Sequence, residues 1–283
     1  MPKDDINYNY TENGVVYDFY DVFVPADYFR LPSLWTWGDN AYGQLGINDT
    51  ADRSTPVTTF AGGNNWKQIA GAKFYSAAIK TDGTLWNWGR NLNGQLGTND
   101  TADRTTPVTT FAGGTNWKSV AGGGYHTAAI KTDGTLWTWG RNSSGQLGIN
   151  ATTIRSTPVT TFLGESSWKS VACGGSYTVA IKTDGTLWTW GRNNLGQLGI
   201  NDTGNRTTPV TTFAGGTNWK SVAGGYNHIA AIKTDGTLWV WGYNSNGQLG
   251  INVAGTTENR TTPVTTFLGG NNWKSVGCGD LGF

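Results

Sequence analysis

Short stretches of alternating apolar and polar residues recur every 51 residues along most of the chain, and residues 117–167 form one complete copy. Residues 117–121, Trp-Lys-Ser-Val-Ala, alternate in this way and end at glycines, as a short strand does. Residues 126–131 and 135–140 flank Thr-Asp-Gly, which predicts a hairpin because Asp and Gly tolerate tight reversals. Residues 157–162 begin Thr-Pro, which indicates an edge strand. No stretch repeats apolar residues at helical spacing, so we expect little helix.

Tryptophan marks the repeat, with 15 residues divided three to a copy. Two of the three stand in Trp-x-Trp-Gly and share one face of a strand, because strand side chains alternate. One sheet alone cannot bury three indoles of about 150–250 Å² each, whereas sheets stacked on both of its faces can. We therefore expect the paired tryptophans to form a structural core between sheets. They are Trp35, Trp37, Trp86, Trp88, Trp137, Trp139, Trp188, Trp190, Trp239 and Trp241. The third of each copy precedes lysine, at Trp66, Trp117, Trp168, Trp219 and Trp273.

A period near 50 residues with four strands per copy is typical of a β-propeller, in which each copy is one blade. The fold class that we predict is all-β: a five-bladed propeller of four-stranded blades over residues 31–283, with an N-terminal extension over residues 1–30. The chain enters the pattern at a third strand and leaves it at a first strand, residues 273–276. We therefore expect the N- and C-terminal strands to pair and close the ring, with residues 27–31 as the missing second strand.

The N-terminal extension, residues 1–30, combines eight aromatic with six acidic residues, which is not the composition of a disordered tail. It either covers a blade edge of its own propeller or serves as an arm that docks on another chain. Residues 15–24 have the pattern of a strand that adds to the edge of a partner's sheet. The docking residues predicted for the arm are Tyr17, Phe19, Tyr20, Phe23, Tyr28 and Phe29.

Charge is sparse, at 14% of residues, with a formal net charge of +1. The 20 basic residues do not form the concentrated patch that binding to a phosphate backbone needs, so we expect no nucleic-acid partner. The first residues, Met-Pro-Lys-Asp-Asp, lack the basic start and apolar run of a secretory leader. No stretch approaches the roughly 18 consecutive apolar residues of a membrane span, so no membrane insertion is expected.

No set of residues suggests catalysis, a metal site or a cofactor, so we expect none of them and predict that the protein is not an enzyme. Its two histidines occupy one repeat position in separate copies, and so do its two cysteines, Cys173 and Cys278. Equivalent positions of a radial fold lie too far apart for a disulfide, so we interpret both cysteines as small buried residues. The Gly-Gln-Leu-Gly stretches lack the Lys-Ser/Thr of a phosphate loop.

Differences among the copies collect at residues 39–42, at residues 73–76 and at their equivalents. We interpret these positions as exposed loop tips, which is where a rigid scaffold carries its binding residues. The binding candidates that follow are Tyr42, Tyr75, His126, Tyr177, His228 and Tyr243.

The order of motifs in each copy supports a family resemblance. Leu-Trp-x-Trp-Gly-x-Asn-x-x-Gly-Gln-Leu-Gly is followed by Thr-Pro-Val, Trp-Lys-Ser-Val-Ala-x-Gly and Ala-Ile-Lys-x-Asp-Gly. This order resembles the regulator of chromosome condensation repeat and recurs five times over about residues 33–280. The resemblance implies a propeller. The best-known members of that family have seven blades, whereas five copies are present here.

Several functions are compatible with such a scaffold. The first is a non-enzymatic structural or adhesion protein, a tail, fibre or decoration component of a bacteriophage virion that assembles in the host cytoplasm. Its partners would be other virion subunits and a glycan or protein of the host surface. The alternative function is a lectin-like, carbohydrate-binding propeller. The alternative to a virion location is a cytoplasmic or extracellular one. The family resemblance adds two minor alternatives, a protein inhibitor and a guanine-nucleotide exchange factor.

Overall fold

The computed structural model describes residues 9–12, 15–18 and 33–279, which fall into two compact units, Met1–Pro32 and Ser33–Phe283. In the first unit, β1 (Asn9–Glu12) pairs antiparallel with β2 (Val15–Asp18). Tyr17 of the predicted arm lies in β2, opposite Tyr10. The other predicted arm residues, Phe19, Tyr20, Phe23, Tyr28 and Phe29, lie outside the described residues.

The second unit contains five antiparallel sheets, four with four strands and the first with two. The first sheet is β3 (Trp35–Gly38) with β4 (Arg53–Thr58). The second is β5 (Trp66–Gly71), β6 (Tyr75–Lys80), β7 (Leu85–Gly89) and β8 (Arg104–Thr109). The third is β9 (Trp117–Gly122), β10 (His126–Lys131), β11 (Leu136–Gly140) and β12 (Arg155–Thr160). The fourth is β13 (Trp168–Cys173), β14 (Tyr177–Lys182), β15 (Leu187–Gly191) and β16 (Arg206–Thr211). The fifth is β17 (Trp219–Gly224), β18 (His228–Lys233), β19 (Leu238–Gly242) and β20 (Arg260–Thr265).

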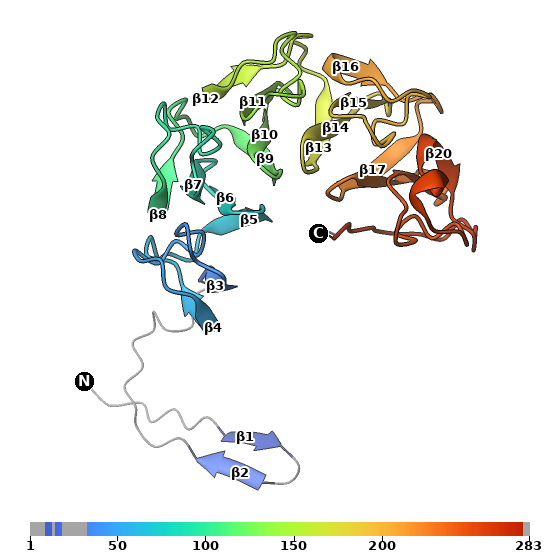
Figure 1. The fold of residues 1–283 in the computed structure, drawn as a ribbon. Coiled ribbons are helices and arrows are strands. Elements are labelled where there is room, and N and C mark those ends of the chain that lie inside the picture. The colour runs from blue at the N-terminus through green and yellow to red at the C-terminus, as the bar shows by residue number, and fades with distance from the viewer. Residues whose placement is uncertain (1–8, 13–14, 19–32, 280–283) are drawn as a thin grey trace. The chain divides into compact units, whose positions relative to one another are not determined.

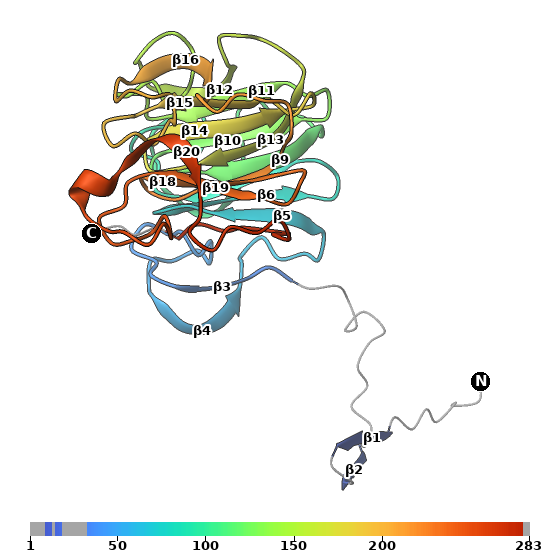
Figure 2. The ribbon, with the colours of Figure 1, turned by 90° about the vertical axis from the view of Figure 1, so that its right-hand side faces the viewer.

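These sheets confirm the predicted all-β propeller architecture of five repeat units. Figure 1 shows them in order around a common centre, from β3 and β4 in blue to β17–β20 in orange and red. The first strand of each complete sheet, such as β5 or β9, lies innermost, and the fourth, such as β8, lies outermost. In the side view of Figure 2, successive sheets lie one above another. The only helical segment in the described part is a 3₁₀ turn, Thr256–Glu258.

Each of the three junctions between complete sheets is an apolar core with a fixed division of roles. One sheet contributes small and branched side chains, such as Ala77, Ile79 and Leu85, and the next contributes indoles, such as Trp117 and Trp139. The second tryptophan of each Trp-x-Trp pair is fully buried in the complete sheets, and the first is partly buried. The prediction that these tryptophans form the core is therefore confirmed for the four complete sheets.

The two-stranded first sheet departs from this prediction. Trp35 is 52% exposed and Trp37 is 60% exposed, so their assignment to the core was wrong. Both indoles belong to the face that, in the later sheets, packs against the preceding sheet, and within residues 33–279 no sheet precedes β3. Within these residues no sheet covers that face, so the burial that the repeat predicts is not found there.

The predicted closure by strand pairing is also not found in residues 33–279, because residues 273–276 form no strand. The other part of that prediction, a strand at residues 27–31, lies outside the described residues. Trp273 instead packs on the apolar face of β18 and β19, where its backbone N–H donates to the carbonyl of Gly236 at 3.1 Å. Trp219 makes the equivalent bond to Gly185 at 3.0 Å, so the C-terminal segment occupies the place of a first strand, with no second strand beside it in residues 33–279.

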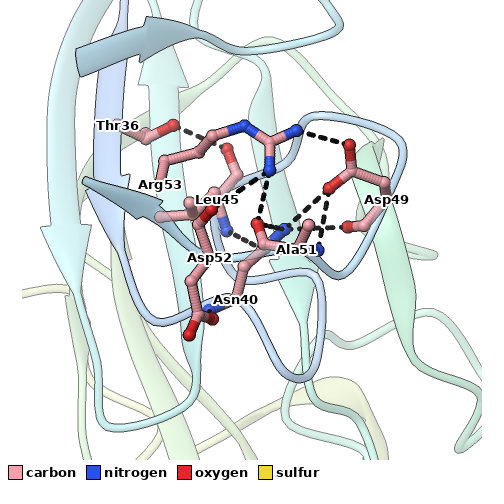
Figure 3. A network of polar contacts seen from close by, with 7 residues as sticks. All are labelled: Thr36, Asn40, Leu45, Asp49, Ala51, Asp52 and Arg53. Carbon is pink, nitrogen blue, oxygen red and sulfur yellow. Dashed lines mark hydrogen bonds and ion pairs between the residues drawn. The ribbon is translucent and has the colours of Figure 1, made fainter. Parts of the chain in front are cut away.

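A polar loop joins the third and fourth strands of each copy, and Figure 3 shows it in the first sheet. The buried Asn40 side chain donates from Nδ2 to the carbonyls of Asp49 and Ala51 and accepts at Oδ1 from the Leu45 amide, at 2.9–3.1 Å. Arg53 donates to the Asp49 carboxylate at 2.6 Å. The acidic residues of this loop are thus engaged by the chain itself, and the asparagine of the repeat motif has a structural role. Its equivalents are also fully buried: Asn91, Asn142, Asn193 and Asn244.

A second asparagine ties each loop to the next sheet. Asn48 has a φ of 67°, and its amide donates to the carbonyl of Thr105 at 2.9 Å. Asparagine tolerates this left-handed conformation better than most residues do. The same bond recurs at Asn99, Asn150 and Asn201. The recurring Asn-x-Thr triplets therefore belong to the junctions between sheets.

Candidate protein-binding face

Two variable positions of each copy meet at one end of the propeller. The turn after the first strand and the loop after the third strand are neighbours, because Tyr75 pairs with Gly89. The Arg90 amide accordingly donates to the Phe74 carbonyl at 3.0 Å. The next copy repeats the bond between Arg141 and Tyr125 at 2.9 Å. Side chains from these positions therefore gather on one surface.

Cations and aromatic rings alternate across this surface. The Arg90 guanidinium lies over the rings of Tyr42, Phe74 and Tyr125, at 4.5, 5.2 and 5.9 Å from their centroids. Lys73 Nζ lies 5.3 Å from the Phe74 centroid. Further contacts place Arg141 5.6 Å from the Tyr125 centroid and Lys73 5.0 Å from that of Tyr226. We call this set the cation–aromatic face: Tyr42, Lys73, Phe74, Arg90, Tyr125, Arg141 and Tyr226.

The cations of this face are held by rings rather than by carboxylates. In residues 33–279, no ion pair within 4.0 Å involves Lys73, Arg90 or Arg141. Asp39 takes the place of Arg90 in the first copy, but its carboxylate accepts from the Ala41 amide and the Gln44 side chain. The face therefore presents positive charge, and each guanidinium is oriented by stacking.

A pit of about 360 Å³ opens between the glycine-rich turns. Lys73 and Tyr226 stand at its wall together with turns from the four complete sheets, residues 71–73, 122–124, 173–175 and 224–226. Side chains are small here because the turns are crowded: a Cβ on Gly124 would lie 2.6 Å from the Gly175 carbonyl oxygen. The pit is wide enough for a side chain or the tip of a loop.

The predicted binding residues divide into two groups. Tyr42 and Tyr243 are partly exposed, and Tyr42 belongs to the cation–aromatic face. The other four are at most 7% exposed, so their interpretation as exposed loop residues was wrong: Tyr75, His126, Tyr177 and His228. Their position begins the second strand, and the side chain crosses to the next sheet. The Tyr75 hydroxyl, for example, donates to the His126 carbonyl at 2.5 Å.

Burial also sets the protonation of the histidines and cysteines. Desolvation lowers the pKa of His126 to about 4, and its Nε2 lies 2.9 Å from Thr178 Oγ1. Desolvation likewise raises the pKa of the two free thiols, to about 12 for Cys173 and about 11 for Cys278. These groups are neutral and packed at neutral pH. Within the described residues, no group of three or more His, Cys, Asp or Glu side chains could hold a metal ion.

The arginines of the face were not among the residues that sequence reasoning selected. A signal was present, because one repeat position carries arginine in three copies, at Arg90, Arg141 and Arg192, but Asp39 and Tyr243 in the other two. A basic residue that recurs at a variable loop position indicates a positively charged surface on the propeller.

The sheets and their junctions define a β-propeller built from tandem repeats. Its repeats match the Regulator of chromosome condensation (RCC1) repeat at residues 33–79, 82–130, 133–181, 184–232 and 235–281. These matches cover most of the chain, and the protein belongs to the RCC1 repeat family. No helix in the described part is long and apolar enough to cross a membrane.

Curated relatives share this repeat region. The chain is 36% identical over 251 residues to the ultraviolet-B receptor UVR8 of Arabidopsis thaliana, covering 87% of this chain and 56% of the relative. It is 32% identical over 245 residues to the mitochondrial RCC1 domain-containing protein RUG3 of Arabidopsis thaliana, covering 82% and 54%. It is 33% identical over 213 residues to the probable E3 ubiquitin-protein ligase HERC4 of Mus musculus, covering 74% and 20%. The chain thus spans about half the length of two of these relatives and a fifth of the third.

Solved structures support the fold. Human WBSCR16 superposes with a TM-score of 0.75 at 24% identity, covering 88% of this chain and 65% of that chain. Prp20p from Saccharomyces cerevisiae superposes with a TM-score of 0.72 at 21% identity, covering 87% and 62%. Both likenesses concern the propeller architecture.

Proposed function

We propose that this protein is a non-enzymatic scaffold that binds an acidic protein surface through its cation–aromatic face. The observation that carries the proposal is the chain of stacked cations, Lys73, Arg90 and Arg141, without a carboxylate partner among the described residues. Arginine and tyrosine are also the residues that dominate protein interfaces energetically. The Prp20p structure is described with that protein's binding to Gsp1p and histones, so a propeller of this architecture does bind proteins.

Stacking makes such a face suited to recognition. A guanidinium that lies on a ring has already lost much of its rotational freedom, so less entropy is lost when a carboxylate binds to it. Unpaired positive charge also steers an acidic partner toward the face and raises the association rate. The fixed loops below, held by buried asparagines such as Asn40 and Asn91, keep the surface in one shape.

The test is binding of the full chain to an array of short peptides of varied charge. We expect selection of Asp- and Glu-rich peptides, and a loss of at least about tenfold in affinity for the Arg90→Glu/Arg141→Glu variant, since each charged contact contributes about 1–3 kcal/mol. The control is Lys118→Glu/Lys169→Glu, which changes the net charge equally at two exposed strand residues outside the face. Peptide selection without acidic preference, or equal losses in the two variants, would contradict the proposal.

The setting that we propose for this scaffold is a bacteriophage virion, as a tail, fibre or decoration component assembled in the host cytoplasm. The near identity of the five copies and the aromatic, acidic composition of residues 1–30 support this setting. Mass spectrometry of purified particles, with gold-labelled antibody in electron microscopy, would locate the protein on the particle. Particles that lack the chain would exclude the setting and leave the binding face to be tested separately.

A specific observation favours carbohydrate binding as a second function. Each copy exposes one phenylalanine two residues after its fourth strand, with 58–67% of the residue accessible: Phe60, Phe111, Phe162, Phe213 and Phe267. An exposed ring offers a flat apolar platform on which a sugar can stack. A glycan array probed with the parent chain and with Phe111→Ala/Phe162→Ala tests this function. Binding that both proteins share equally would remove Phe111 and Phe162 as glycan sites, and no binding at all would remove all five rings.

A further inference from the structure

The edge of β3 that faces away from β4 carries no other strand in the described part of the chain. We propose that this edge is a strand-addition site for an extended segment of a partner protein with the pattern (Tyr/His)-x-(Ala/Val)-Ala-Ile-Lys. A partner's strand would form main-chain hydrogen bonds with β3 and extend the first sheet by one strand. This mode of recognition uses an unpaired sheet edge for affinity and side-chain pockets for specificity.

A groove of about 350 Å³ lies at this edge. Trp35 and Trp37 of β3 line one side, and Ala72, Tyr75 and Ser76 of the next sheet line the other. Two residues of this second wall, Ala72 and Ser76, correspond to Gly123 and Thr127 one repeat later. Both of these contact β6, the second strand of the preceding sheet. The Gly123 amide and the Thr127 hydroxyl donate to the Tyr75 hydroxyl of β6 at 3.2 and 2.9 Å. The groove therefore lies where a second strand would lie.

The complete sheets show which strand fits this place. Their second strands all read as an aromatic or histidine residue, one variable residue, Ala or Val, and then Ala-Ile-Lys. The four examples are β6, β10, β14 and β18. In β6 the second alanine, Ala78, pairs with Trp86 and is completely buried, so the position demands a small side chain. Ile79 is completely buried as well.

The chain's own sequence at the corresponding distance does not match this pattern. One repeat before β6 stand residues 24–29, Val-Pro-Ala-Asp-Tyr-Phe, which lie outside the described residues. Pro25 has no amide hydrogen to donate to a sheet. Asp27 corresponds to the buried Ala78, where a carboxylate would lose its hydration without a partner. The pattern that four sheets share therefore indicates a strand from another protein.

Added strand pairing would change the environment of β3 in a measurable way. The main-chain groups along the open edge of β3 would gain hydrogen-bond partners, as those of β7 do through pairing with β6. The first residue of the added strand, Tyr or His, would lie beside Ser76, because the Tyr75 and Thr127 side chains make this contact one junction later, at 2.9 Å. Recognition would thus combine main-chain bonds, small buried side chains and one polar contact at the start of the strand.

The experiment uses the full chain and a capped peptide, Tyr-Ser-Ala-Ala-Ile-Lys-Thr, the sequence of residues 75–81. We expect saturable binding by calorimetry and slower hydrogen exchange of the amides in residues 34–38. Two control peptides sharpen the result: one with alternate amides N-methylated, and one with Asp in place of the second Ala. Each should bind at least about tenfold more weakly, because each loses main-chain bonds or buries a charge.

The Arg90→Glu/Arg141→Glu variant should bind the parent peptide as well as the unchanged protein does, which separates this site from the cation–aromatic face. Three results would overturn the proposal. The N-methylated peptide would bind equally well if the contact were not strand pairing. The amides of residues 34–38 would be protected without peptide, at any protein concentration, if the chain's own segment filled the groove. Protection that grows with protein concentration would mean that a second copy fills it.

Discussion

Trp88 and Trp37 occupy the same repeat position, yet the first is completely buried and the second is 60% exposed. The Trp88 indole donates to the Gln44 carbonyl of the preceding sheet at 2.9 Å, and Gly46 of that sheet packs on its ring. For Trp37, no preceding sheet lies within residues 33–279. The comparison teaches that burial belongs to the junction between two sheets and not to the repeat by itself.

The largest effect should come from removing one indole on each side of this comparison. Trp88→Ala should lower the free energy of unfolding by about 3–5 kcal/mol, because it leaves a cavity in a packed junction. Trp37→Ala should cost less than about 1 kcal/mol, since the ring is mostly solvated. Urea denaturation followed by circular dichroism measures both. Equal losses would mean that Trp37 is buried in solution.

Acid should weaken the interior junctions through His126. Because burial lowers its folded pKa to about 4, below the usual value near 6.5, the unfolded chain binds more protons between these values. The stability contribution is complete above pH 6.5 and should fall by up to about 3 kcal/mol as the pH approaches 4. Denaturation midpoints across this range give the slope. The His126→Tyr variant carries the residue that the second sheet has at the equivalent position, Tyr75, and should make stability less dependent on pH. An unchanged slope would mean that another group causes the acid sensitivity.

Two glycines allow the effect of a side-chain clash at a junction to be separated from the effect of backbone strain. Gly148 and Gly250 have similar positive φ values, +67° and +61°, so alanine strains both backbones alike. A Cβ on Gly148 would lie 2.7 Å from Trp190 Nε1, whereas Gly250 has nothing within 4 Å. Gly148→Ala should therefore destabilise the protein by about 1–3 kcal/mol more than Gly250→Ala, as overpacking does. Thermal denaturation of the two variants gives this difference directly. Equal shifts would show that the fifth sheet is covered in solution.

The smallest effect should follow removal of a charge pair at an interior junction. Lys182 lies between the rings of Trp168 and Trp188 and pairs with the partly exposed Glu165. Glu165→Gln should cost less than about 1 kcal/mol, because solvent screens the pair and the rings still hold the lysine stem. Denaturation at low and at high salt measures the pair. A larger, salt-sensitive loss would mean that ions rather than indoles hold the sheets together.

The repeat predicted the sheets because the information for them is local. Alternation in Trp-x-Trp, the Asp-Gly reversal at Gly134 and the edge proline at Pro158 are all visible within one copy, and each appears in the structure as expected. The exposure of Trp35 could not be predicted in this way, because its copy has the same Trp-x-Trp-Gly motif as the copies whose tryptophans are buried. The difference lies in the neighbouring sheet, and the sequence of one copy does not specify which sheet packs against it.

The candidate site shows a different limit. Variation between copies was interpreted as exposure, but Tyr75 and His126 vary inside a junction, where either side chain reaches a polar atom of the next sheet. Arg90 and Tyr42, which do meet at the surface, come from different copies of the repeat. Their contact depends on the angle between two sheets, and that angle follows from packing that no single copy encodes.

The bond from the Asn48 amide to the Thr105 carbonyl recurs unchanged between the later sheets. Four junctions between neighbouring sheets therefore share one main-chain contact, although their buried side chains differ. A gain or loss of one whole block by recombination joins surfaces that already share this contact and leaves both outer ends as they were. Such a gene can lengthen or shorten its product in blade-sized steps without first evolving a new contact.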